Sequence, residues 1–204
     1  MASPVARKPY SPRRSREERR EQVLDAALRV LDEHGFVGLS IEAVAREADL
    51  AKTVVYGAAG NQEELLDALV AREQERAARD VAAALPAPPF DSPEDLLGDG
   101  ITKLLRNVRD HPATWRLILL PSEGTPPTLR AAVDGHREQL RRQLGPIVSW
   151  GLEQLSADDI DPEIATHALL ATVENAIRLT LTEPDRFTPR RLADFGRAIV
   201  RRVA

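Results

Sequence analysis

The sequence predicts an all-α protein with a small N-terminal helical domain and a larger C-terminal one. Apolar residues recur at three- and four-residue steps in most segments, the periodicity of helices with one buried face. Ser, Asn, Asp and Pro stand where these segments begin, as they do at helix N-termini. No segment alternates like a strand, so we expect about nine helices. With 204 residues, 43% of them apolar, the chain can build a sizeable core.

The composition excludes several classes of function. The absence of cysteine rules out disulfides, cysteine nucleophiles and thiolate metal sites. No fully apolar run, Leu117–Pro121 included, approaches the roughly 20 residues of a membrane span. No nucleophile–base set, metal-binding spacing or glycine-rich phosphate loop is present. We therefore expect a cytoplasmic protein that is not an enzyme, has no membrane partner and holds no metal or cofactor.

The N-terminal segment is strongly basic. Residues 1–20 contain seven Arg or Lys against two Glu, although the whole chain has a net charge of −4. Three prolines within residues 1–14 favour a disordered arm. A basic arm on an acidic body is typical of a protein with one nucleic-acid-binding face, and a solvated tail is the alternative.

A helix–turn–helix pattern follows the first helix, which we expect from Ser15 to about His34 with Gly35 as its C-terminal stop. Residues 40–65 then give a short helix capped by Ser40, a turn and a very short helix that ends at Tyr56. Two helices joined by 3–4 residues is the geometry that places the second helix in the DNA major groove. A plain helical hairpin in another all-α protein is the alternative.

The remaining helices begin at clear start signals. Asn61 and Glu64 form a capping box that opens a helix from Gln62 to about Leu85. Further helices are expected to about Arg109, over residues 113–120, from Pro127 to Leu155, from Asp161 to Thr182 and from Thr188 to Val203. Gly145-Pro146 should kink or split the long one. We divide the chain into a basic arm (1–14), a helix-turn-helix domain (15–62) and a larger helical domain (63–204).

This order of helices, together with residues 16–70, resembles the tetracycline-repressor (TetR) family. The matching positions are Ala26, Ala27, Gly35, Ile41, Val44, Ala45, Ala48, Lys52, Tyr56, Asn61, Glu63 and Leu65. The resemblance implies three N-terminal helices that bind DNA, a fourth that links them to a larger helical domain, and a small-molecule effector bound in that domain. It also implies a homodimer formed by the last two helices. The residues we assign to that interface are Ala168, Ile177, Leu192, Phe195, Gly196 and Ile199.

The chain departs from the family at several DNA-contacting positions. Ala51 stands where a serine usually caps the recognition helix, and Val54 stands where a phosphate-binding threonine is usual. Ala58 and Ala59 replace a histidine and a phenylalanine, and Gln62 replaces a lysine. Fewer phosphate contacts imply a lower affinity for DNA and a weaker salt dependence.

The candidate DNA contacts combine phosphate binding with a sparse set of base contacts. Hydroxyl groups and the single lysine of the second helix can reach phosphates, whereas Thr53 and the two valines can meet base edges or a thymine methyl. Either valine can instead belong to the core. The assigned residues are Arg13, Arg14, Arg16, Ser40, Lys52, Thr53, Val54, Val55, Tyr56, Asn61 and Gln62.

The C-terminal domain contains polar residues on otherwise apolar helix faces. A mostly apolar pocket with a few placed polar groups is typical of a small-molecule site. The assigned pocket residues are Trp115, Ile118, Leu119, His136, Leu140, His167, Ala171, Glu174, Asn175 and Arg178. The alternatives are a core histidine at His136, core tryptophans, and a solvent-facing Glu174–Arg178 pair.

These features predict a DNA-binding transcriptional regulator, a repressor that a small-molecule effector releases from its double-stranded operator. The alternative is a helical small-molecule-binding protein of the same fold with weakened or lost DNA binding, because several phosphate-contacting positions are altered.

Overall fold

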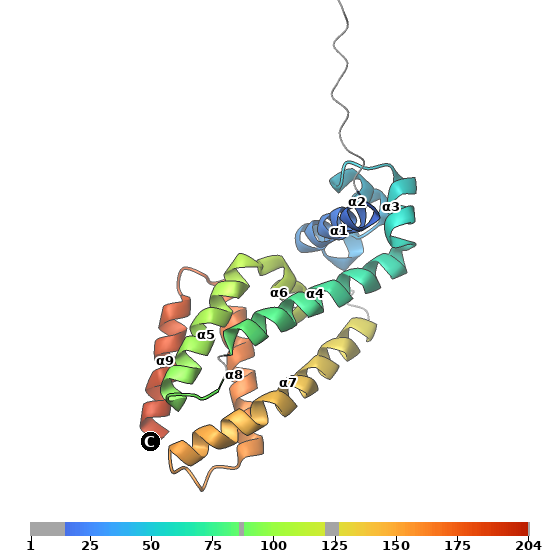
Figure 1. Ribbon diagram of the computed structural model, residues 1–204. Coiled ribbons are helices and arrows are strands. Elements are labelled where there is room, and N and C mark those ends of the chain that lie inside the picture. Colours follow the sequence, from blue (N-terminus) through green and yellow to red (C-terminus); the bar gives the residue numbers. More distant parts are fainter. Residues whose placement is uncertain (1–14, 86–87, 121–126, 204) are drawn as a thin grey trace, which may run out of the picture.

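A computed structural model describes residues 15–85, 88–120 and 127–203, and this part of the chain forms nine helices and no strand (Figure 1). The all-α prediction is confirmed. The helices are α1 (Arg16–Gly38), α2 (Ile41–Glu47), α3 (Lys52–Ala59), α4 (Gln62–Ala84), α5 (Pro93–Asp110), α6 (Pro112–Leu119), α7 (Pro127–Gln154), α8 (Pro162–Thr182) and α9 (Pro189–Val203). Within the described residues, no helix is long and apolar enough to cross a membrane.

Helices α1 to α3 pack around a dense apolar core that the start of α4 completes. Leu24 and Val44 are buried at its centre, and Leu65 and Leu69 close it from α4. These residues recur at helical spacing, so each helix turns one apolar stripe inward. The packing of the small N-terminal domain therefore extends into the helix that leads to the rest of the chain.

Two backbone positions shape the turns of this small domain. The helical geometry of α1 breaks at Gly35, which has φ 65, so the expected stop lies inside the segment bounded as α1. A short turn then continues to Gly38. Asp49, in the turn between α2 and α3, has φ 53, a left-handed conformation that glycine, Asn and Asp adopt most readily.

The larger domain is built from α4 to α9. In Figure 1, α4 runs out of the small domain and α5, α8 and α9 gather around its far half, while α7 lies along the other side. Helix α5 packs mainly on α9 and α4, and α7 packs on α8. The core of this domain includes Leu105, Val108 and Ile177.

Helix α7 continues through Gly145-Pro146, so the split allowed by the sequence does not occur. Pro146 removes one backbone N–H and leaves one carbonyl of the preceding turn without its helical donor. Pro146 and Arg142 are both exposed, so water can satisfy that carbonyl. An exposed position therefore tolerates a proline that a buried position would not.

Candidate functional sites

The outward face of α3 is the candidate DNA-reading surface. Thr53 is exposed, and Val54 and Tyr56 are 37% and 52% exposed. Val55 is fully buried in the N-terminal core, so it cannot present its methyl groups to a base. This corrects the assignment of Val55 as a DNA contact: adjacent residues of a helix point about 100° apart, so Val55 can face the core while Val54 remains partly exposed.

The charge on α3 is already paired. Lys52 donates a hydrogen bond from Nζ to Glu42 Oε1 of α2 at 2.5 Å. The same hydrogen bond lowers the pKa of the Glu42 carboxyl, which is fully exposed. Lys52 must therefore release Glu42 before it can bind a phosphate through its full charge.

Several other assigned residues already hold the backbone. Ser40 Oγ caps α2 at the Ala43 N–H, and Asn61 Oδ1 accepts from Glu63 and Glu64 at the start of α4. Gln62 Nε2 donates to the Leu39 carbonyl at 2.8 Å, which joins α4 to the segment before α2. Their role in DNA binding stays a prediction. Arg16 is exposed at the start of α1, and the assigned Arg13 and Arg14 lie outside the described residues.

The start of α3 lacks a cap, as the sequence indicates. Ala51 occupies the N-cap position and makes no side-chain hydrogen bond to the helix. By contrast, Ser15 and Asn61 each form a complete capping box at α1 and α4. Of α1, α3 and α4, the helix expected to contact DNA is thus the one whose N-terminus has no side-chain cap.

A cavity of about 720 Å³ opens in the C-terminal domain between α4, α5, α6, α7 and α8. Its wall is mostly apolar and its size suits a drug-sized organic molecule. Of the residues assigned to a pocket, Trp115, Ile118, Leu119, Leu140 and Glu174 line it. Whether they bind an effector stays a prediction.

The other pocket assignments on α8 fall elsewhere. His167, Ala171, Asn175 and Arg178 are all exposed and are absent from the cavity wall. The cavity-facing stripe of α8 instead contains Leu170, Val173 and Ile177 besides Glu174. His167, Asn175 and Arg178 therefore lie on the solvent-facing side of α8, next to the side that lines the cavity. The side chain of His136 lies outside the described residues.

Helix α4 contributes to the cavity wall, which was not predicted from the sequence. Gln74, Ala77, Ala78 and Val81 line the cavity from this helix. Their spacing of three and four residues is the signal that could have identified them, because it continues the apolar stripe beyond the small domain. Four polar residues also went unrecognised: Gln74, Arg137, Gln139 and Gln143.

The charged groups in the cavity wall neutralise each other. Arg137 of α7 donates from Nε and Nη2 to the two carboxylate oxygens of Glu174 at 2.7 and 3.0 Å. This hydrogen bonding raises the pKa of the Arg137 guanidinium. Glu174 therefore pairs across to α7 rather than along its own helix with Arg178.

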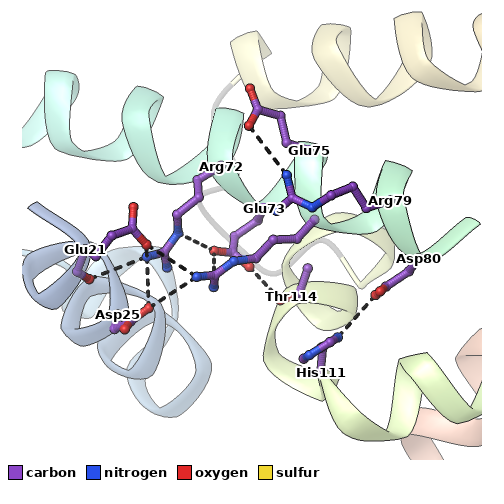
Figure 2. A network of polar contacts seen from close by, with 10 residues as sticks. Glu21, Asp25, Arg72, Glu73, Glu75, Arg79, Asp80, His111 and Thr114 are labelled. Atoms are coloured by element: carbon purple, nitrogen blue, oxygen red, sulfur yellow. Dashed lines mark hydrogen bonds and ion pairs between the residues drawn. The ribbon is translucent and has the colours of Figure 1, made fainter. Parts of the chain in front are cut away.

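A polar network joins the two domains at α4. Arg72 Nη1 donates to Asp25 at 2.8 Å and to Glu21 at 3.0 Å, both on α1. Its Nε donates to Glu73 at 2.7 Å, and Glu73 also accepts from Thr114 Oγ1 of α6 at 2.5 Å. Glu73 is fully buried, and Figure 2 shows these groups converging from the three helices. We call Glu21, Asp25, Arg72, Glu73, Arg76 and Thr114 the α1–α4–α6 joint.

Helix α6 has one face on each domain. Arg116 Nη1 donates to both oxygens of Asp32 of α1 at 2.8 and 3.0 Å, and Leu117 packs against the N-terminal core. Trp115 and Ile118 line the cavity. The Trp115 Nε1 also donates to Asp80 of α4 at 3.2 Å, so both cavity and small domain contact the same short helix.

An apolar surface remains uncovered on the last two helices. Ile164 of α8 is 69% exposed, and Phe195 and Ile199 of α9 are 59% and 47% exposed. Of the residues assigned to a dimer interface, Ala168, Phe195 and Ile199 are exposed. Ile177 and Gly196 are buried within the chain, and Leu192 is half-buried, so these three belong mainly to the internal packing of α8 and α9.

The described residues contain no group of three or more His, Cys, Asp or Glu that could hold a metal ion. What the site geometry offers is a helix–turn–helix surface, an apolar cavity, and a joint that connects them.

Comparison with known proteins shows a similarity to one family of bacterial regulators. Residues 23–69 match the family model described as "Bacterial regulatory proteins, tetR family". An HTH-type transcriptional regulator of Mycobacterium tuberculosis is 29% identical over 128 residues, which cover 59% of this chain and 53% of the relative. The chain thus spans about half the length of the curated relatives it matches.

Solved structures show the same fold over almost the whole chain. A TetR-like transcriptional regulator from Rhodococcus sp. RHA1 has a TM-score of 0.75 at 24% identity, covering 93% of this chain and 97% of that one. AibR, solved in complex with isovaleryl coenzyme A and operator DNA, has a TM-score of 0.70 at 20% identity, covering 89% and 97%. The chain is therefore similar to bacterial regulators of the tetR family over residues 23–69, and it shares the fold of TetR-like transcriptional regulators over most of its length.

Proposed function

We propose that the protein is a DNA-binding repressor that a small molecule in the C-terminal cavity releases from its operator. The observation that carries this proposal is that α4 and α6 serve both sites. Both helices line the cavity, and both hold α1 through buried or charged contacts. A change in the cavity wall therefore has a direct structural route to the DNA-binding domain.

The energetics of release require two states of the protein. A ligand shifts the equilibrium only if it binds one state more tightly than the other. Insertion of a molecule against Trp115 and Ile118 would press α6 and α4 apart, and Arg116 and Arg72 would carry that displacement to α1. The state that accommodates the ligand would then hold the recognition helices in a different position.

A homodimer completes the proposal. Ile164 of α8 and Phe195 and Ile199 of α9 are exposed apolar side chains that a second copy of the chain could cover. A two-fold axis there would pair two α3 helices, and operator half-sites lie about 34–36 Å apart, one turn of DNA. Small changes in that separation abolish a simultaneous fit.

Other proteins of this fold support both partners. AibR was solved with isovaleryl coenzyme A and operator DNA together. In this proposal residues 15–62 bind DNA, residues 63–204 bind the effector and dimerise, and residues 1–14 add phosphate contacts as a basic arm. The protein would work in the cytoplasm, where it reaches chromosomal DNA.

The test is binding of the full-length protein to labelled DNA from upstream of its own gene, measured by fluorescence anisotropy. We expect a specific complex whose affinity falls steeply between 50 and 200 mM salt. Thr53→Ala and Tyr56→Phe should each weaken it, because their exposed hydroxyl groups lie on the outward face of α3. Thr182→Ala, an equally exposed hydroxyl at the end of α8, is the matched control and should leave binding unchanged.

A second candidate function follows from two observations on α3. Lys52 is held by Glu42, and Ala51 provides no cap. Both weaken a DNA-reading helix, as expected of a helical small-molecule-binding protein whose DNA binding has decayed. Failure to form any specific complex at low salt, with ligand binding intact, would favour this function over repression.

A further inference from the structure

One polar group on the cavity wall has no partner in the protein. Gln74 lies on the cavity-facing stripe of α4, one turn before Ala77 and Ala78. Its Nε2 is buried and makes no hydrogen bond. Buried donors are nearly always paired, because an unpaired one loses its bonds to water without replacement. A ligand oxygen in the cavity could accept a hydrogen bond from this donor.

The position of the amide allows it to reach a ligand. The last side-chain torsion of glutamine is broad, so a small rotation turns the N–H toward an oxygen placed in the cavity. The surrounding wall consists of Ala77, Ala78, Trp115 and Ile118, whose lining atoms are mainly apolar. Little else in that part of the wall competes for a ligand oxygen.

The charge balance of the wall argues against an anionic ligand. Among the described residues that line the cavity, Arg137 is the only Lys or Arg. Glu174 engages it through two hydrogen bonds, so the pair has no net charge. A carboxylate or phosphate would have to displace Glu174 or lie unpaired in an apolar enclosure, and either alternative is costly.

We infer that the effector is a neutral, mainly apolar molecule with a carbonyl oxygen that accepts a hydrogen bond from Gln74. This inference rests on the proposed effector function of the cavity. It adds a specificity-determining residue and a ligand class: an ester, ketone or lactone on a hydrocarbon body. The cavity volume of about 720 Å³ fits a molecule of that kind.

The same hydrogen bond would act at a sensitive place. Gln74 directly follows Glu73, the buried carboxylate that accepts hydrogen bonds from Arg72 of the same helix and from Thr114 of α6. A ligand that fixes the Gln74 side chain therefore constrains the turn of α4 that carries the α1–α4–α6 joint. The same turn of α4 would then bind the ligand carbonyl and pass the resulting displacement to the DNA-binding domain.

The experiment is displacement of the neutral dye Nile red from the full-length protein by molecules of matched chain length. The series is decane, methyl decanoate, decanol, decanoate and decanoyl-CoA. Trp115 and Trp150 both line the cavity, so quenching of tryptophan fluorescence reports binding independently of the dye. We expect methyl decanoate to bind about tenfold more tightly than decane or decanoate, as one buried hydrogen bond provides.

Two variants assign that preference to the amide. Gln74→Leu and Gln74→Glu both lack the N–H donor and should bind methyl decanoate and decane equally well. Gln139→Leu changes another glutamine of the wall, one that is exposed, and should retain the ester preference. Circular dichroism verifies that each variant is folded, and the glutamate variant keeps the side-chain size if the leucine variant misfolds.

The outcomes separate this inference from the proposed function. If neither Nile red nor any member of the series binds, the cavity is not an effector site and the proposed function fails. If ester and alkane bind equally to the wild type, the cavity stands and the role of Gln74 is overturned. Tighter binding of decanoate or decanoyl-CoA would overturn the neutral ligand class, and tighter binding of decanol than of methyl decanoate would overturn the carbonyl oxygen as the recognised group.

Discussion

The two halves of this molecule are packed in opposite ways. In the DNA-binding domain, Leu24, Val44, Val55 and Leu65 are all less than 2% exposed, so their side chains fill the space between the helices. In the C-terminal domain, no described side chain of α7 is fully buried, because this helix faces a cavity on one side. A filled core resists deformation, whereas a hollow one can change shape when a ligand enters.

The boundary between these halves is polar. Arg72, Glu73 and Thr114 form hydrogen bonds and an ion pair there, whereas apolar contacts hold the interior of each domain together. Ion pairs and hydrogen bonds have directional geometry, so a small shift of one helix breaks some of them and forms others. A rigid N-terminal domain that is attached to a deformable C-terminal domain through such a joint can take two positions relative to it.

The largest effect is expected at the joint itself. Glu73→Ala leaves Arg72, whose side chain is only 9% exposed, without its nearest carboxylate. Removal of one member of a buried ion pair costs about 3–5 kcal/mol. Urea unfolding followed by circular dichroism measures this loss of stability.

Glu75→Ala is the matched control two residues further along α4. Its carboxylate is 74% exposed and pairs with Arg79 at 4.0 Å. Exposed pairs contribute about 0–1 kcal/mol, so this variant should unfold nearly like the wild type. Equal destabilisation by both substitutions would show that the joint has no special role in holding α4.

A pair of leucine truncations tests the packing difference directly. Leu65→Ala empties a fully buried site in the small domain and should cost about 3 kcal/mol. Leu140→Ala enlarges a cavity that already exists, so only the lost burial counts and the cost should be about 1 kcal/mol. Urea unfolding of the two variants gives both numbers, and equal losses would mean that the C-terminal domain is not hollow in solution.

Most of the fold followed from local signals in the sequence. Cap residues such as Ser40, Asn61 and Asp161 begin the helices that they predict, because a side-chain acceptor at that position bonds the free N–H groups of the first turn. Gly35 adopts the positive φ expected of a stop. Pro146 was misleading because local rules do not include the solvent that satisfies an exposed carbonyl.

The candidate site was less predictable, because it depends on how helices face one another. The polar line of His167 and Arg178 has the spacing of a binding face, yet the rotation of α8 turns it to solvent. The pairing of Glu174 with Arg137 joins two helices, and no spacing within one helix predicts it. Gln74 could be recognised only after the cavity and its unpaired donor were located.

A smaller effect is expected at the uncapped N-terminus of α3, in the densely packed N-terminal domain. Ala51→Ser supplies the missing N-cap of α3 and should stabilise the protein by about 1 kcal/mol, because its hydroxyl can accept from a free N–H of the first turn. Ala58→Ser places the same residue inside the helix, where no free N–H exists, and should give no gain. Thermal unfolding of both variants distinguishes capping from a general effect of serine.

The smallest effect concerns the charged surface of the DNA-binding domain. Glu42→Gln should free Lys52 for a phosphate, tighten operator binding about threefold and steepen the slope of log affinity against log salt by about 0.9. The hydrogen bond from Lys52 lowers the pKa of Glu42, so the pair persists at neutral pH. In the wild type the ion pair is lost only as the pH falls through that lowered pKa.

Glu138→Gln is the control. Glu138 is also exposed, and Arg141 lowers its pKa in the same way, on a helix of the other domain. Fluorescence anisotropy at several salt concentrations measures both variants, and an unchanged slope for Glu42→Gln would mean that Lys52 does not contact the operator.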